Sequence, residues 1–443
     1  MGNKQVEGED YGETFSPVAR MGTVRLFLET AVKYGWKVHQ MDVQNAFLHG
    51  DLEEEVYMRL PPGYQLPDKN KVCRLRKSLY GLKQAPRCWF AKLTTALKDY
   101  GFVQSLADYS LFTYEQGAVR IHILIYVDDL IIAGSNEDAT AKFKDYLASC
   151  FKMKDLGELK YFLGIEIARN ESGMYLCQRK YALDIIAETG LLGCKPVNFP
   201  LDQNHSLQFS KSRILSDPTP YRRLLGRLIY LGVTRLDLAY SVHLLAQFMK
   251  EPKEDHWHAA IRVVNYLKSD PGQGILLRSD NDFQVTGWCD SDWSRCRMSR
   301  RSVTGYFIQL GNSPVSWKTK KQKTVSRSSA EAEYRAMADL VQKLIWLKRM
   351  LHTLGVFHVQ PMNVYYDSKS AIHIASNPVF HERTKHIEND CHFVRDEVVS
   401  RNILLQHVNT KTQLANIFTK PLGTESFEDF RSKLGILNLY GPA

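Results

Sequence analysis

Two adjacent carboxylates, Asp128 and Asp129, interrupt an apolar stretch that runs from Ile121 to Ala133. The stretch has the composition of two paired β-strands, so the carboxylates are predicted to lie at the tip of a hairpin. Buried charges are costly unless they are paired or bound to a metal ion. The pattern therefore favours a divalent cation as their partner, and the alternative is a solvated turn in which both aspartates face water.

Composition and charge narrow the class of protein independently of this motif. The 443 residues allow two or three domains, and the 44% hydrophobic and 24% charged residues are typical of a soluble protein. A net charge of +10 favours a polyanionic partner, because neutralising phosphates releases counterions. The eight cysteines form no CxxC pair, which indicates reduced thiols in an intracellular compartment. No apolar segment reaches membrane length, so neither a transmembrane helix nor a signal peptide is predicted.

Local patterns divide the chain into segments. Residues 1–200 alternate strand and helix patterns, and within them Pro86 begins a helix that Gly101 ends. Residues 201–220 are polar and rich in Ser, Asp and Pro, which predicts a connector. Residues 221–270 have the apolar periodicity of helices. The chain is therefore predicted to be a multidomain protein of α+β and α/β modules.

Motifs along nearly the whole chain carry a family resemblance. In chain order they include QMDVQNAFLHGDLEEEVYMRLPPGY, SLYGLKQAPRCWF, ILIYVDDLIIAG, MKDLGELKYFLGIEI, YRRLLGRLIYL, GWCDSDWS, SSAEAEYRA, DSKSAI and FTKPL. Their order and spacing resemble the reverse transcriptase and ribonuclease H (RNase H) regions of copia-type long-terminal-repeat retrotransposons. The resemblance implies a polymerase palm with truncated fingers over residues 1–200 and a linker with a helical thumb or connection over 201–280. It implies an RNase H-like fold over 281–422 and a C-terminal tail over 423–443.

For the polymerase module, the resemblance implies a two-metal site. Asp42 ends a short apolar segment, and with Asp128 and Asp129 it would hold two Mg²⁺ ions, with Mn²⁺ as an alternative ion. One ion would activate the primer 3′-hydroxyl, and the other would hold the triphosphate.

Other residues of this module are implied to contact the substrates. Phe47 would crowd a ribose 2′-hydroxyl and favour deoxynucleotides, whereas a core phenylalanine is the alternative. Tyr80 and Gly81 would contact the nucleotide and template. Residues 163–165 (Leu-Gly-Ile) would form the primer grip, and Tyr126 would lie beside the primer end.

The final third has the order strand, strand, strand, helix, strand, helix, strand, helix, which agrees with the implied RNase H-like fold. Asp290 is predicted to end the first strand, Glu331 to begin the long helix and Asp367 to follow a strand at 362–366. By resemblance these three carboxylates would hold metal ions for hydrolysis of RNA. Each has an alternative: Glu331 could close a capping box with Ser328, Asp367 could cap a helix, and Asp290 could be a turn residue.

Two departures from the family pattern affect the expected activity. The last acidic ligand is expected in a QLAD-type motif, but Asn416 stands at its place, and a neutral amide should hold a divalent ion less firmly. The basic strand resembling YKARLV, which precedes GNKQVEGEDYGETFSPVAR in the family, is not found before Met1. We therefore expect weakened RNA cleavage and poor nucleotide binding, in an excised fragment or a degenerate genomic copy of a polyprotein.

The expected function is RNA-directed DNA synthesis with cleavage of RNA in RNA–DNA hybrids. The alternative is a catalytically degenerate remnant that only binds nucleic acid. Expected partners are an RNA template, a DNA primer, the hybrid, dNTPs and other polyprotein products, in a cytoplasmic virus-like particle or the nucleus. Two basic clusters would face the nucleic-acid backbone, or would only form a solvated surface. They are Arg295, Arg297, Arg300 and Arg301, and Lys318, Lys320, Lys321 and Lys323.

Overall fold

The computed structural model describes residues 2–64, 71–376 and 388–438. Within these ranges no helix is both long enough and apolar enough to cross a membrane.

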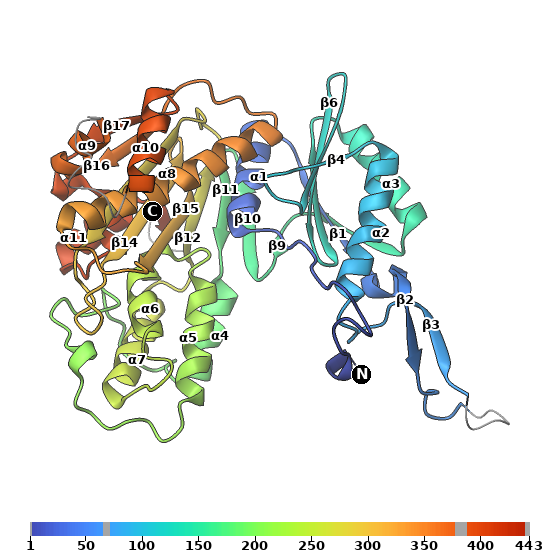
Figure 1. Ribbon diagram of the computed structural model, residues 1–443, viewed down its shortest axis with the longest axis horizontal. Helices are drawn as coiled ribbons and strands as arrows, with labels where there is room; N and C mark the ends of the chain where they lie inside the picture. Colours follow the sequence, from blue (N-terminus) through green and yellow to red (C-terminus); the bar gives the residue numbers. More distant parts are fainter. Residues whose placement is uncertain (1, 65–70, 377–387, 439–443) are drawn as a thin grey trace. The chain divides into compact units, whose positions relative to one another are not determined.

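The chain packs as two compact units (Figure 1). The first consists of residues 1–159 with 353–355, and the second of residues 160–352 with 356–443. The predicted first module extends to residue 200, whereas the second compact unit begins at residue 160. The division into four modules stays a prediction.

The first unit is built on a six-stranded antiparallel sheet. In spatial order its strands are β4 (Val103–Gln104), β5 (Leu111–Gln116), β6 (Val119–Tyr126), β7 (Asp129–Gly134), β1 (Val38–Val43) and β8 (Met153–Glu158). The predicted pairing of two strands within residues 121–133 is confirmed, because β6 and β7 form a hairpin. Their apolar side chains are buried because they lie in the middle of the sheet.

Two helices, α2 (Ala85–Tyr100) and α3 (Glu137–Cys150), supply the apolar side chains that cover one face of this sheet. Trp89, Leu93 and Leu97 of α2 belong to the same buried cluster as residues of β1, β6 and β7. The predicted helix ends are confirmed, since α2 has proline in its first turn and ends at Gly101 with φ 110°.

The first unit also contains elements outside this sheet. They are the 3₁₀ helices η1 (Gly2–Lys4) and η2 (Ala46–His49), the helix α1 (Met21–Lys33), and the antiparallel ribbon of β2 (Asp51–Met58) and β3 (Cys73–Lys77), which projects from the unit in Figure 1.

The second unit contains two five-stranded sheets. The first joins β18 (Ile436–Asn438), β12 (Gln273–Arg278), β11 (Gly173–Cys177), β10 (Ile165–Asn170) and β9 (Tyr161–Phe162), in that order. The predicted C-terminal tail, residues 423–443, therefore contributes a strand to this sheet, after the helix α11 (Thr424–Lys433).

The second sheet has the order β15 (Ser313–Lys321), β14 (Val303–Leu310), β13 (Val285–Asp292), β16 (Met362–Tyr366) and β17 (Ile403–His407). The first three strands are antiparallel, and β16 and β17 run parallel to β13. The long helix α8 (Ser329–Thr353) follows β15. In the described residues two helices, α9 (Lys369–Ser376) and α10 (Glu388–Val399), stand between β16 and β17, where one was predicted.

Helices also form the region of residues 221–270, as predicted. They are α5 (Thr219–Leu231), α6 (Ala239–Ala246) and α7 (Glu254–Ser269), and α4 (Arg179–Glu188) packs with them.

The polar segment 201–220, predicted as a connector, is largely irregular but attached to the second unit. Leu201 and Leu207 are buried, and the ammonium of Lys253 donates to the Ser210 carbonyl (2.7 Å). The segment is therefore a packed connection rather than a free linker.

Candidate active sites

Three carboxylates of the first unit lie at one end of its sheet. Asp42 in β1 is the antiparallel partner of Asp129 in β7, and Asp128 lies in the two-residue turn before β7. The backbone amide of Val43 donates to the Asp128 carbonyl (3.0 Å), which holds the turn against β1. The register of the sheet thus places all three predicted carboxylates together, and each of them is half-buried.

The turn that carries Asp128 has an unusual backbone. Val127 has φ 59°, a conformation that β-branched residues rarely adopt and that stores local strain. The indole Nε1 of Trp89 donates to the Val127 carbonyl (2.8 Å). Helix α2 therefore anchors the strained turn through this hydrogen bond. A shift of the turn that carries the aspartates would break it.

Electrostatics at this cluster follow from the proximity of like charges. Burial raises the pKa of the Asp129 carboxyl, the hydrogen bond from Gln40 Nε2 (3.1 Å) lowers it, and the charges of Asp128 and Asp42 raise it further. The net pKa is raised, which means that the charged form lacks a compensating cation in the protein itself.

The aromatic rings of Phe47 and Tyr80 lie in contact with each other. Phe47 is in η2, which follows β1, and its ring centroid is 4.8 Å from that of Tyr80. The hydroxyl of Ser78 donates to the Phe47 carbonyl. Gly81 has φ 95°, so it provides a left-handed turn that favours glycine. The two aromatic residues thus form one half-exposed ring pair.

The predicted primer grip is a tight hairpin in the second compact unit. Residues 163 and 164 connect β9 and β10, and both have positive φ (49° for Leu163 and 73° for Gly164). Two consecutive left-handed residues form the turn type that matches the twist of a hairpin. The hydroxyl of Tyr230 donates to the Leu163 carbonyl and anchors the turn to α5.

A second group of carboxylates lies on the β13–β17 sheet. Asp290 is in β13, and Asp367 directly follows β16. The two strands are parallel, with Trp288 opposite Tyr365, so Asp290 and Asp367 each lie two residues beyond a matched pair. The third carboxylate is that of Glu333, in the first turns of α8.

The pKa shifts of this group show which side chains interact. Burial raises the pKa of Asp290, the charge of Lys420 and the hydrogen bond from Thr419 lower it, and the charge of Asp367 raises it. Burial also raises the pKa of Glu333, the hydrogen bond from Ser368 lowers it, and the charges of Asp367 and Asp290 raise it. Asp367 and Asp290 are therefore near enough to Glu333 for their charges to raise its pKa.

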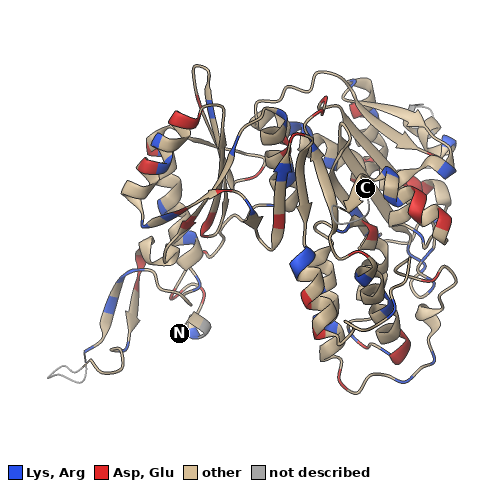
Figure 2. Cartoon of the chain, turned by 180° about the vertical axis from the view of Figure 1, so that it is seen from behind, with Lys and Arg blue, Asp and Glu red and all other residues tan. Residues whose placement is uncertain are grey.

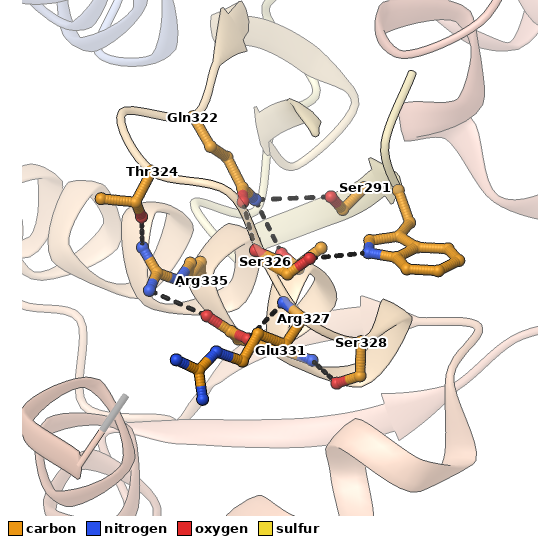
Figure 3. Close-up of polar contacts among 10 residues, drawn as sticks. Ser291, Gln322, Thr324, Ser326, Arg327, Ser328, Glu331 and Arg335 are labelled. Carbon is orange, nitrogen blue, oxygen red and sulfur yellow. Dashed lines mark hydrogen bonds and ion pairs between the residues drawn. The ribbon is translucent and has the colours of Figure 1, made fainter. Parts of the chain in front are cut away.

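Glu331, the predicted third ligand, has the capping role that was its alternative. Its Oε2 accepts from the backbone amide of Arg327 (2.7 Å), and its own amide donates to Ser328 Oγ (3.2 Å). Its Oε1 forms an ion pair with Arg335 Nη2 (2.9 Å), as Figure 3 shows. These contacts agree with the capping alternative, because they use both carboxylate oxygens to hold the start of α8.

Asn416 lies next to the second group through Thr419. The Thr419 hydroxyl donates to Asp290 and to the Asn416 carbonyl (3.2 Å). The Asn416 Nδ2 donates to the Thr410 carbonyl (2.7 Å), whereas its Oδ1 is buried with no hydrogen-bond partner in the described structure. Lys420 Nζ lies 3.6 Å from Asp290 Oδ2 and supplies the one cation of the protein that pairs with this carboxylate in the described residues.

Comparisons with known proteins show which family has a similar sequence. The family described as reverse transcriptase (RNA-dependent DNA polymerase) matches residues 1–203. The Pol polyprotein from transposon RE2 of Arabidopsis thaliana is 44% identical over 99% of this chain, and that from transposon TNT 1-94 of Nicotiana tabacum is 35% identical over 98%. A transposon Ty5-1 protein of Saccharomyces cerevisiae is 32% identical over 69% of this chain and is covered along its whole length (100%). The chain belongs to the Pol polyprotein family of copia-type retrotransposons. It spans 30% of the RE2 polyprotein and 33% of the TNT 1-94 polyprotein.

The carboxylates of this Pol chain have the chemistry of a divalent-cation site. Asp129 and Asp290 are buried or half-buried acids with raised pKa values beside further acids, and oxygen donors of this kind suit Mg²⁺. The unpartnered Oδ1 of Asn416 is a further oxygen ligand on the segment that Thr419 connects to Asp290. In the described residues, however, no three His, Cys, Asp or Glu side chains converge closely enough to form a metal site as they stand.

Glu333 and Lys420 are the residues of the Pol chain that sequence reasoning missed. The signal for Glu333 was present in the helical periodicity, since the buried residues Ala336, Met337 and Leu340 follow it at spacings of three, four and seven. A Cβ built on Gly287 of β13 would lie 3.0 Å from Leu340, which shows that this stripe of α8 packs on β13. Lys420 gave no such signal, because its partner Asp290 is 130 residues earlier.

Proposed function

We propose that this chain is an RNA-directed DNA polymerase whose second compact unit cleaves the RNA strand of RNA–DNA hybrids. The observation that carries the proposal is the register of β1 and β7, which opposes Asp42 to Asp129 with Asp128 in the adjoining turn. Membership of the Pol family supports the class of reaction.

In the first unit, Asp42, Asp128 and Asp129 would hold the divalent ions. When bound, Mg²⁺ supplies positive charge at the primer 3′-hydroxyl and at the triphosphate. The chain itself supplies the rigid support: the Trp89 contact to Val127 and the Val43 contact to Asp128 hold the turn that carries the carboxylates. Pre-organisation of this kind keeps reacting groups aligned during the reaction.

Phe47 is proposed to select deoxynucleotides. Its ring lies against Tyr80, and its backbone is fixed by the Ser78 hydroxyl, so it cannot rotate away easily to admit a ribose 2′-hydroxyl. Selection by excluding a single hydroxyl requires a rigid wall of this kind.

In the second unit, Asp290, Glu333 and Asp367 are proposed to hold the ions for hydrolysis of RNA. Exposed cations in the loop before β14, in β15 and just after β15 support binding of the hybrid backbone, since phosphate contacts position nucleic acid without reading its sequence. They are Arg297, Arg300, Arg301, Lys318 and Lys323, and none of them forms an ion pair within the described ranges. Figure 2 shows Lys and Arg interspersed with Asp and Glu along the chain. The exposed cations near β14 and β15 are therefore a local group of basic residues.

The second candidate function is hybrid binding without effective RNA cleavage. Two observations favour it: Asn416 is a neutral residue beside Asp290, and Lys420 Nζ lies 3.6 Å from Asp290 Oδ2, where its charge competes with that of a metal ion. Either residue would reduce the affinity of the site for a divalent ion.

Primer extension by the purified chain tests the proposal. A DNA primer on an RNA template should be extended in a Mg²⁺-dependent reaction, and the double variant Asp128→Asn/Asp129→Asn should not extend it. The same chain should shorten the RNA of a labelled hybrid, and Glu333→Gln should abolish that cleavage while extension continues. Extension by the double variant would mean that these aspartates are not the polymerase site.

A further inference from the structure

One buried amide, that of Gln322, joins the strand that carries Asp290 to the helix that carries Glu333. Gln322 directly follows β15, and its side chain is buried. Its Nε2 donates to the Ala332 carbonyl (2.8 Å) and to Thr304 Oγ1 (3.0 Å), and lies 3.4 Å from Ser291 Oγ. Figure 3 shows this side chain pointing toward Ser291 and Ser326.

The orientation of the amide is determined by its partners. The Ala332 carbonyl can only accept a hydrogen bond, so the nitrogen of the amide must face it. The Gln322 Oε1 then accepts from the Ser326 hydroxyl (3.0 Å). Both ends of the amide are satisfied, which makes the arrangement specific as well as stable.

The partners of Gln322 are the immediate neighbours of the candidate catalytic carboxylates. Ser291 directly follows Asp290 in β13, and Ala332 directly precedes Glu333 in α8. Thr304 of β14 is the antiparallel partner of Ser291, so the amide reaches two adjacent strands at once. A shift of Gln322 would therefore change the separation of Asp290 and Glu333.

The start of α8 depends on polar contacts of this kind. Residues 323–328 form no regular element, and all the buried apolar residues of α8 except Ala332 lie beyond Glu333. Besides Gln322, the loop is held by the indole of Trp293, which donates to the Ser326 carbonyl (3.0 Å), and by Glu331 as described above. Glu333 and Asp290 carry like charges and repel each other. Uncharged hydrogen bonds are therefore required to hold together the two segments that carry them.

We propose that Gln322 is a positioning residue for RNA-strand hydrolysis, which ties the start of α8, with Glu333, to the strand that carries Asp290. The inference rests on the proposed function of the Asp290, Glu333 and Asp367 group. Residues that orient metal ligands typically contribute about 10- to 100-fold to activity or metal affinity when they are removed.

Gln322→Met tests this role, because methionine has a similar volume but lacks the amide. We expect the kcat for cleavage of a hybrid to fall about 10- to 100-fold with an unchanged KM, because the hybrid is bound elsewhere. The matched control is Asn281→Leu, which removes another buried amide of the same unit, one that donates to the Leu310 carbonyl (2.5 Å). Asn281→Leu should lower stability without lowering kcat. Equal kcat values for Gln322→Met and Asn281→Leu would overturn the proposal.

A milder variant covers the case in which Gln322→Met does not fold. Thr304→Val keeps the shape of the residue and removes only the contact on β14. It should lower kcat several-fold at constant KM, and an unchanged kcat would overturn the proposal.

Calorimetric titration with Mn²⁺ separates this inference from the proposed function. It is carried out on the full chain with Asp128→Asn/Asp129→Asn, so that the first unit does not contribute. If the chain binds Mn²⁺ but does not cleave hybrids, the proposed hydrolysis fails, and weaker Mn²⁺ binding by Gln322→Met would still support positioning. Equal Mn²⁺ affinity with and without Gln322→Met would overturn positioning. A chain that neither cleaves nor binds Mn²⁺ would overturn both.

Discussion

Asp42 lies directly opposite Asp129 on two neighbouring antiparallel strands. Like charges at such a pair destabilise a sheet, and the pair is half-buried with no basic side chain hydrogen-bonded to Asp129 in the described residues. The protein therefore carries a local cost to stability at the site where a divalent ion is proposed to bind.

Removing one charge of this pair should stabilise the protein while it abolishes polymerisation. We expect Asp129→Asn to raise the free energy of unfolding by about 0.5–1 kcal/mol without divalent ions, because the repulsion is lost and Gln40 can still donate to the amide oxygen. Urea denaturation in EDTA measures this change. With Mg²⁺ added, the parent chain should gain more stability than the variant, because only the parent keeps all the carboxylates of the first unit. A destabilised variant in EDTA would contradict this view of the pair.

Glu331 and Glu333, two residues apart on α8, should respond oppositely to the same substitution. Glu333→Gln should abolish RNA cleavage with little change in stability, whereas Glu331→Gln should retain cleavage and lower stability by up to about 1 kcal/mol through its capping contacts. Cleavage of a labelled hybrid and thermal unfolding measure the two effects. Loss of cleavage in Glu331→Gln alone would restore the original prediction for that residue.

Asn416→Asp should increase cleavage at limiting Mg²⁺ because it adds a charged oxygen ligand beside Asp290. It should also lower stability by about 1–2 kcal/mol in EDTA, since the donor to the Thr410 carbonyl is lost. Rates measured across a Mg²⁺ titration test the first effect. Asn409→Asp, the same change at an exposed residue of this segment, is the control. Identical rates for Asn416→Asp and the parent chain would refute the hypothesis.

Phe47→Ala should admit ribonucleotides. The ratio of rNTP to dNTP incorporation should rise about 10- to 100-fold, because the wall beside the sugar is removed. Single-nucleotide extension with each substrate measures the ratio. Phe47→Tyr keeps the ring and should keep the discrimination, so a relaxed Phe47→Tyr variant would assign selectivity to another residue.

His122 should make stability depend on pH between about pH 4 and 6.5. Burial lowers the pKa of His122 to about 4, and neither ring nitrogen has a hydrogen-bond partner in the described structure. The unfolded chain binds a proton at higher pH than the folded chain does, so stability is complete above the unfolded pKa and falls as the pH decreases. From pH 7 to pH 5 the loss from this residue is about 2 kcal/mol.

The pH dependence of His122→Leu isolates this contribution. Urea denaturation at both pH values should show a smaller loss for the variant than for the parent chain. His205 and His243, whose pKa values are also lowered to about 4 by burial, contribute equally to both proteins. Equal losses would show that His122 is not protonated on unfolding in this range.

The sequence by itself determined the local elements and the motifs. The hairpin of β6 and β7, the ends of α2 and the strand before Asp367 all agree with prediction, because each depends on residues within a few positions of one another. Family resemblance also identified Asp42, Asp128 and Asp129, and the sheet register then placed Asp42 opposite Asp129.

Only the tertiary structure decided which side chains meet across long separations. The choice between Glu331 and Glu333 depends on which face of α8 packs on β13. Lys420 pairs with Asp290 across 130 residues, and β18 pairs with β12 across more than 150 residues. Such contacts arise from the closure of sheets and the packing of buried faces, which local sequence preferences do not specify.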